Sequence, residues 1–93
     1  MKDFIISLSP VDGRKSFYGK AVALKSTDGT WWCRSYNTIV CSVDKNGTFH
    51  RHWDGYSATT MQHINAFIRF CGIEGGGKAW WDNQEVTKPV FED

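Results

Sequence analysis

The hydrophobic pattern changes its period at Gly55, and this change constrains the fold more than any other feature of the sequence. Before Gly55, apolar and β-branched residues lie in short segments bounded by turn dipeptides, a pattern typical of β-strands. After it, four apolar residues recur at spacings of three and four: Met61, Ile64, Ile68 and Cys71. This spacing places them on one face of a helix. The sequence therefore predicts an α+β fold in which a sheet is followed by one main helix.

Two turn signals divide the part before Gly55 into strands. Asp28-Gly29 and Asn46-Gly47 are each flanked by β-branched and aromatic residues, the signature of a two-residue hairpin loop. The expected strands are residues 17–26, 30–44 and 48–53, and alternation over residues 4–8 adds an edge strand. The second strand is long, so we expect a bend or bulge near residues 35–37, or a break there into two short strands. The result is an antiparallel meander of three or four strands.

The expected helix, residues 57–71, has readable ends, and a short extension follows it. Ser57 is a good N-cap, and Gly72 supplies a C-terminal stop. Beyond them, residues 75–77 are three glycines that form a flexible joint before Trp80-Trp81. Two adjacent tryptophans are costly to expose, so we expect a short helix or turn that returns one of them to the core or to a neighbouring chain.

Length, hydropathy and charge exclude several classes of protein. Ninety-three residues suffice for one domain, and a mean hydropathy of −0.43 without a long apolar segment argues against a membrane span or a signal peptide. A net charge of +1 argues against a strongly basic nucleic-acid binder. Three cysteines without CxxC spacing favour a reducing cytoplasm over a disulfide framework. We therefore expect a cytoplasmic protein that needs no cofactor.

Aromatic residues make up 15% of the chain, which is high for so small a core. One helix of about fifteen residues covers only one face of such a sheet. We therefore expect a homo-oligomer in which a second copy covers the other face.

A histidine motif raises the question of catalysis. His50, His52 and Asp54 alternate along a predicted strand, so their side chains project to one face, as metal ligands or an acid–base pair require. The spacing resembles that of metallo-β-lactamase-fold hydrolases, but those need ligands from further loops of a longer chain. We therefore expect no metal site and no enzyme.

The start of the helix is a better candidate, because hydroxyl groups and unpaired backbone N–H groups at the positive end of a helix dipole bind anions. The simpler interpretation of these residues is ordinary capping. The residues that would hold phosphates or stack on a base in such a site are Tyr18, Lys20, Trp31, Trp32, Arg34, Tyr36, Arg51, Tyr56, Ser57, Thr59 and Thr60. Further candidate charge partners for a bound anion are Arg14, Lys15 and Arg69.

Residues 16–21, 35–40 and 55–61, with His63-Ile64-Asn65 and Phe67, resemble the recurrent blocks of a small uncharacterised family from bacteriophages and mobile elements of gut bacteria. The resemblance covers about residues 16–70 and carries no established activity. It implies a phage origin and a site of action in the cytoplasm of an infected cell.

Together these features favour a binding protein. We expect a phage anti-defence protein that sequesters a nucleotide-type immune signal of the host. One alternative is an inhibitor that docks on a host defence protein, such as a CRISPR effector, through an aromatic patch. Others are a nucleic-acid-binding regulator that uses the basic residues 14–25 and, last, a hydrolase that uses His50, His52 and Asp54.

Overall fold

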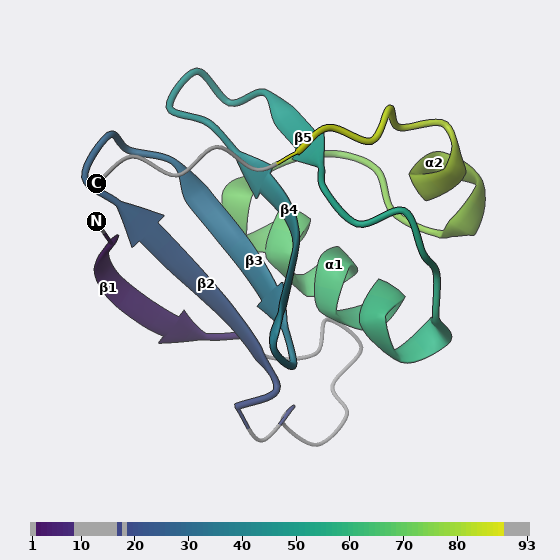
Figure 1. Ribbon diagram of the computed structural model, residues 1–93, viewed down its shortest axis with the longest axis horizontal. Helices are drawn as coiled ribbons and strands as arrows, with labels where there is room; N and C mark the ends of the chain where they lie inside the picture. The colour runs from purple at the N-terminus through teal and green to yellow at the C-terminus, as the bar shows by residue number, and fades with distance from the viewer. Residues whose placement is uncertain (1, 9–16, 18, 89–93) are drawn as a thin grey trace.

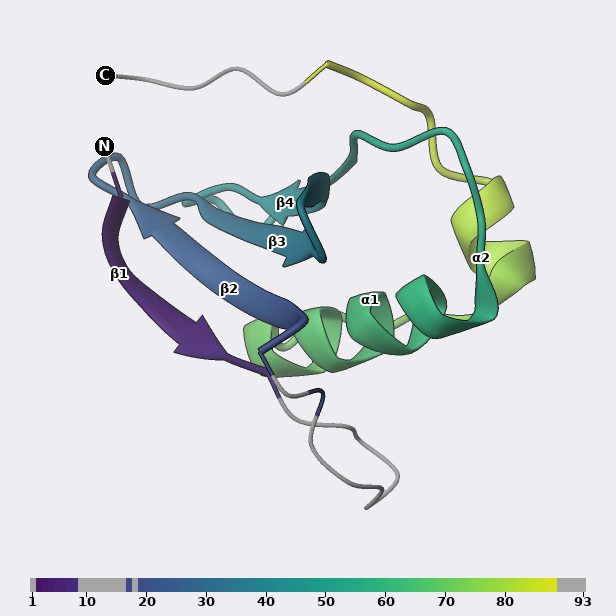
Figure 2. The same cartoon turned by 60° about the horizontal axis from the view of Figure 1, so that its bottom comes forward.

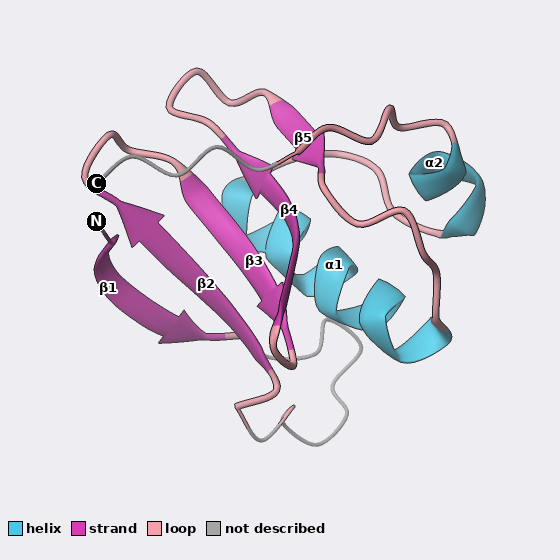
Figure 3. Cartoon of the chain, in the orientation of Figure 1, coloured by secondary structure: helices cyan, strands magenta, loops and turns pink. Residues whose placement is uncertain are grey.

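The computed structural model describes residues 2–8, 17 and 19–88. Its elements are β1 (Lys2–Ser7), β2 (Ala21–Ser26), β3 (Trp31–Ser35), β4 (Thr38–Val43), β5 (Phe49–Arg51), α1 (Ala58–Cys71) and α2 (Lys78–Asp82). The strands form one antiparallel sheet in the order β1-β2-β3-β4-β5, so each pairs with its neighbours in the chain (Figures 1 and 3). Helix α1 lies along one face of the curved sheet (Figure 2). The predicted α+β meander with one main helix is confirmed.

A fifth strand is present because the long segment of residues 30–44 is broken. Ser35 pairs with Thr38, which leaves Tyr36 and Asn37 as a two-residue turn between β3 and β4. Tyr36 has a φ of 56°, in the left-handed region that favours glycine. The break, rather than a bend in one long strand, is therefore the correct alternative, and it places Cys33 directly opposite Cys41.

The two Xaa-Gly hairpins have three-residue loops, so the prediction of two-residue loops was wrong. In the first, Ser26 N donates to Thr30 O at 2.9 Å, and in the second Asp44 N donates to Thr48 O at 3.0 Å. The glycines, Gly29 at φ 91° and Gly47 at φ 84°, occupy the last loop position. A three-residue hairpin loop consists of an ordinary turn followed by a residue in the left-handed conformation. Asp-Gly and Asn-Gly fit this loop as well as the two-residue loop, so the dipeptides do not distinguish the two.

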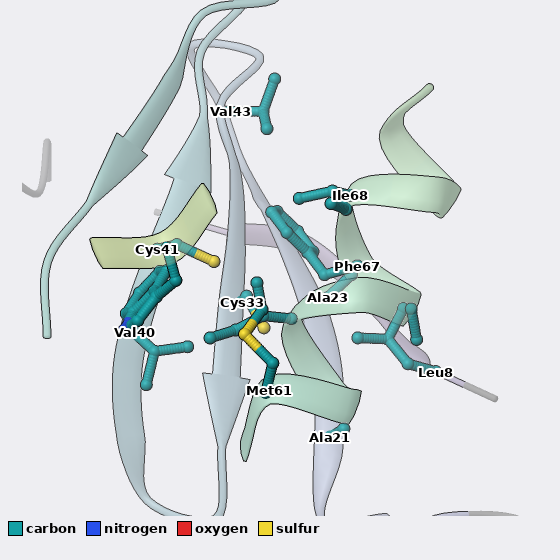
Figure 4. Packing of buried hydrophobic residues seen from close by; sticks show 13 residues of the cluster. Leu8, Ala21, Ala23, Cys33, Val40, Cys41, Val43, Met61, Phe67 and Ile68 are labelled. Carbon is teal, nitrogen blue, oxygen red and sulfur yellow. The ribbon is translucent and has the colours of Figure 1, made fainter. Parts of the chain in front are cut away.

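The main core lies between α1 and the sheet. Met61, Ile64 and Phe67 of α1 are at most 5% exposed, and their side chains meet small residues of the strands, such as Ala23 and Cys33 (Figure 4). Small strand residues let the helix approach closely. Burial raises the pKa of the Cys41 thiol well above its ordinary value, and that of Cys71 to about 12, so these cysteines are core thiols.

Both ends of α1 are as predicted. The Ser57 hydroxyl accepts a hydrogen bond from Thr60 N at 3.0 Å, and Gly72 ends the helix at φ 77° with its N–H donating to Arg69 O. Neither helix of the described chain has the length and apolar character needed to cross a membrane.

The segment after α1 folds back onto β5. Trp81 of α2 is fully buried, whereas Trp80 is only partly buried, which confirms that one of the adjacent pair returns to the core. Arg51 of β5 fixes this segment: its guanidinium lies 4.3 Å from the Trp81 ring and donates to Trp81 O at 2.8 Å. The chain then runs back along β5, where Thr87 N donates to Arg51 O at 2.7 Å (Figure 1).

Candidate functional site on the helix-free face

The alternation of strand residues places a second set of side chains on the face that α1 leaves uncovered. Cys33 and Cys41 point to the core, so Trp32 and Ser42 point the other way. Two histidines share this face with Ser42. His50, on β5, is paired with Ser42 in the strand register, and His52, just beyond β5, is hydrogen-bonded to the Ser42 hydroxyl. Residues 83–88 pass over the same side of the sheet (Figure 2).

A pocket of about 200 Å³ opens on this face. The residues that line it come from β3, β4, β5, the connecting loops and the C-terminal segment: Thr30, Trp32, Ser42, Asp44, His50, His52, Thr87 and Lys88. Its volume is below that of a typical drug-sized site, so it has room for one ring or one phosphoryl group and not for a whole nucleotide.

His52 is held at both ring nitrogens. Nδ1 lies 2.7 Å from Thr87 O, and Nε2 lies 2.8 Å from the Ser42 hydroxyl. A carbonyl only accepts, so Nδ1 carries the hydrogen and Nε2 accepts from Ser42. Burial lowers the pKa of His52, which matches this neutral form.

His50 is paired with Asp44 instead. Its Nε2 lies 3.0 Å from Asp44 Oδ2, and its side chain is 38% exposed. The other oxygen of Asp44 accepts from Asn46 N at 2.9 Å and Thr48 N at 3.0 Å. The hydrogen bond from His50, followed by those from the backbone, lowers the pKa of Asp44, so the carboxylate is ionised and Nε2 of His50 is the donor. The two histidine rings are almost parallel, with centroids 6.4 Å apart.

Trp32 and Arg34 supply an aromatic face and a cation beside the pocket. The Trp32 ring centroid is 5.6 Å from that of His52. Arg34 lies two residues along β3 on the same face, between Val22 and Ile39 in the register. Among the described residues its buried Nε has no hydrogen-bond partner, and such a group costs free energy unless something else accepts from it.

Arg51 has a different environment from the one predicted for it. It is 7% exposed, and its guanidinium donates to the backbone carbonyls of Trp53, Trp81, Gly55 and Gln84. These hydrogen bonds use the guanidinium to anchor the C-terminal segment, and Arg51 is not among the residues that line the pocket.

The residues predicted at the helix start form a separate cluster at the other end of the sheet. Thr60 is buried and lies 3.2 Å from the Ser35 hydroxyl, which also lies 2.7 Å from Nδ1 of His63. The Tyr36 ring is near His63, with Lys20 6.0 Å from its centroid. Ser57 is used as a cap, as in the simpler interpretation.

The remaining predicted residues are dispersed. Trp31 packs on Phe70 of α1 with ring centroids 4.9 Å apart, so Trp31 faces the helix, whereas Trp32 lies on the other face of the sheet. Tyr56 and Thr59 are exposed, and Tyr56 lies 5.4 Å from Lys78. Arg69 lines a second hollow, of about 430 Å³, beside the glycine joint. Tyr18, Arg14 and Lys15 lie outside the described residues.

The structure divides the predicted histidine motif. His50 and His52 share a face, but Asp54 is exposed beyond the end of β5, and Asp44 takes its place beside His50. In the described part of the chain no three His, Cys, Asp or Glu side chains are grouped as metal ligands.

Sequence reasoning missed Thr30, Ser42, Asp44, Thr87 and Lys88. Two of them had a partial signal: a three-residue loop over residues 45–47 pairs Ser42 with His50 and brings Asp44 to the loop beside it, whereas the predicted two-residue loop would pair Ser42 with Arg51. Thr87 and Lys88 had none, because their approach to β5 depends on the distant Arg51–Trp81 contact.

Comparison with known proteins gives one match. Residues 6–83 match a family of unknown function, DUF8033. No curated protein and no solved structure matches the chain. Because the matched region covers most of the 93 residues, the chain belongs to the DUF8033 family.

Proposed function

We propose that this protein captures a small anionic ligand of nucleotide type on the helix-free face of its sheet. The observation that carries the proposal is the pocket itself, in which an indole, two imidazoles and the Lys88 ammonium group surround a space of about 200 Å³. Aromatic faces stack on bases, and cations and ring N–H groups hold phosphates.

Arg34 extends this site beyond the pocket. A ring bound against Trp32 leaves the rest of the ligand on the surface, because the pocket is too small to enclose a whole nucleotide. Arg34 is the next residue of β3 on that face, and its guanidinium is a cation close enough along the strand to pair with a phosphate that extends from the pocket. Trp32 and Arg34 are both among the predicted ligand residues, and this proposal rests on them: Trp32 lines the pocket, and Arg34 follows it on the same face of β3.

The proposed setting is a cell infected by a phage. The resemblance of residues 16–70 to proteins of bacteriophages and mobile elements supports it. In that setting, sequestering a nucleotide signal suppresses host defence without altering any host protein. The predicted homo-oligomer is part of the same proposal.

The test is thermal melting of the purified protein against linear and cyclic nucleotides, because a ligand that binds only the folded state raises the melting temperature. We expect the shift to be lost in Arg34→Gln and reduced in Trp32→Leu. The matched control is Ser57→Ala with Thr59→Val, which alters the helix start and leaves the pocket intact. If that control loses the shift and Arg34→Gln keeps it, the ligand lies at the helix start and this site assignment is wrong.

An absence of any shift across the panel contradicts nucleotide capture. The docking alternative then becomes the working hypothesis, and retention of a defined host defence protein on the immobilised chain would test it.

A further inference from the structure

The register of the sheet places a small residue between two large rings in the pocket. Ser42 on β4 pairs with Trp32 on β3 and with His50 on β5, and all three line the pocket. Two strand spacings, about 9.5 Å, separate the backbones of Trp32 and His50. Ser42 is short and only 2% exposed, so it forms the floor of a slot that has a ring on either side.

Asp44 lies at one end of this slot. It follows Ser42 by two residues, just past the end of β4, and it lines the pocket with 30% of its side chain exposed. Within the described part of the chain, its Oδ1 accepts from Asn46 N and Thr48 N, and its Oδ2 accepts from Nε2 of His50. A carboxylate has about four acceptor positions, so Oδ2 has room for one further donor.

The slot favours a flat ring over a phosphoryl group. Three hydrogen-bond donors of the pocket already have acceptors in the protein: the Ser42 hydroxyl and one ring nitrogen of each histidine. The ionised Asp44 carboxylate also repels a phosphate inside the slot. A bound nucleotide therefore has its base in the slot and its phosphate outside.

The register also sets the direction of such a ligand. Arg34 pairs with Ile39 near the start of β4, whereas Asp44 lies just beyond the other end of that strand. The space over Ser42 is thus between a cation and a carboxylate. A nucleotide with its phosphate toward Arg34 presents the far edge of its base to Asp44.

We propose that Asp44 selects a nucleotide whose base carries an exocyclic amino group, as in adenine and cytosine. The amino N–H donates to Oδ2 of Asp44, in the position that the hydrogen bond from His50 leaves available. Hypoxanthine and uracil carry a carbonyl oxygen at the same place, and two acceptors in contact repel each other. Their ring N–H reaches the carboxylate only with that carbonyl oxygen beside it.

The inference rests on the proposed function, because it names the class of nucleotide that the same pocket takes. Its test compares nucleotides that differ only at the amino position: AMP with IMP, and the 3′,5′-cyclic forms of the two. Ribose and phosphate are the same within each pair, so a difference in affinity, measured by isothermal titration calorimetry, reports on the base. Within each pair that binds, we expect the adenine member to bind at least about tenfold more tightly.

Asp44→Asn should abolish or reverse this preference, because its amide offers a donor to the carbonyl oxygen of hypoxanthine. The amide oxygen still accepts from the backbone of the loop between β4 and β5, so the hairpin is retained. Asp28→Asn is the matched control. Asp28 accepts from Thr30 N at 2.9 Å in the other hairpin and is not among the residues that line the pocket, so this variant should keep the preference.

Equal affinities within the pairs that bind would overturn the inference and leave the proposed capture function standing, with the phosphate beside Lys88 in the pocket. This comparison uses the unmodified protein and needs no variant to fold. A preference that persists in Asp44→Asn, or that is lost equally in Asp28→Asn, would also overturn the inference. An absence of binding by all of these nucleotides would contradict the capture function itself and the inference with it.

Discussion

In the part of the chain that the structure describes, each face of the sheet carries a serine–histidine hydrogen bond, and the two bonds are of similar length but have different surroundings. On the helix side, Ser35 contacts Nδ1 of His63 at 2.7 Å, and the histidine is 1% exposed among Phe17, Tyr36 and α1. On the other side, Ser42 contacts Nε2 of His52 at 2.8 Å beside a pocket that also contains His50 and Lys88. A serine beside a histidine therefore indicates little by itself, and the surrounding groups separate a packed polar pair from a candidate site.

The largest difference between the faces should be in stability. Phe67→Ala removes a fully buried ring from the core beneath α1 and should cost about 3–5 kcal/mol. Leu24→Ala on the helix-free face should cost about 2 kcal/mol, because its cluster has few members. Denaturant unfolding of both variants measures the two free energies. Equal losses of unfolding free energy in the two variants would show that packing on the helix-free face contributes as much to stability as packing beneath α1.

Loss of Arg51 should affect the helix-free face from a distance. Arg51→Met keeps the length of the side chain but leaves buried carbonyls without donors, at a cost of about 1–3 kcal/mol. The C-terminal segment should loosen, so amide exchange should accelerate over residues 81–87 and nucleotide binding should weaken. Unchanged binding would show that the pocket does not need this segment.

Acid should weaken the fold through both serine–histidine pairs. Burial lowers the pKa of His52 and of His63 below the ordinary value of 6.5, so the unfolded chain takes up their protons first. Stability is therefore complete above pH 6.5 and falls as the pH drops below it. Thermal melts from pH 8 to pH 5 should show this slope, and His52→Gln and His63→Gln should each flatten it.

Of the two histidine variants, only His52→Gln should also affect ligand binding. His52→Gln alters the pocket, whereas His63→Gln leaves it unchanged. A change in nucleotide affinity in His63→Gln alone would place the site on the helix side.

The smallest expected effect concerns the turn between β3 and β4. Tyr36 adopts a left-handed conformation, so Tyr36→Gly removes strain and should leave stability within about 1 kcal/mol of the parent. Its ring also contacts Lys20, which lies in the helix-start cluster. A loss of nucleotide binding in Tyr36→Gly would favour that cluster over the pocket.

The sequence was informative wherever structure is local. The periodicity of residues 61–71, the Ser57 cap and the Gly72 stop predicted α1 because each acts within a few residues. The break at Tyr36 was harder to predict, because a bulky residue is an uncommon occupant of that turn position. The candidate site was harder still: Trp32 and Arg34 were among the predicted residues, but Thr87 and Lys88 reach the pocket only through tertiary contacts.

The way in which the C-terminal segment closes the pocket also sets an order of events during folding. From β2 to β5, neighbouring strands pair through short loops, so this part of the sheet can form from contacts that are local along the chain. Thr87 must instead find His52 over a separation of 35 positions along the chain, with α1 and α2 between them. We therefore expect the pocket to assemble last, so that in a refolding experiment the recovery of ligand binding lags behind the recovery of secondary structure.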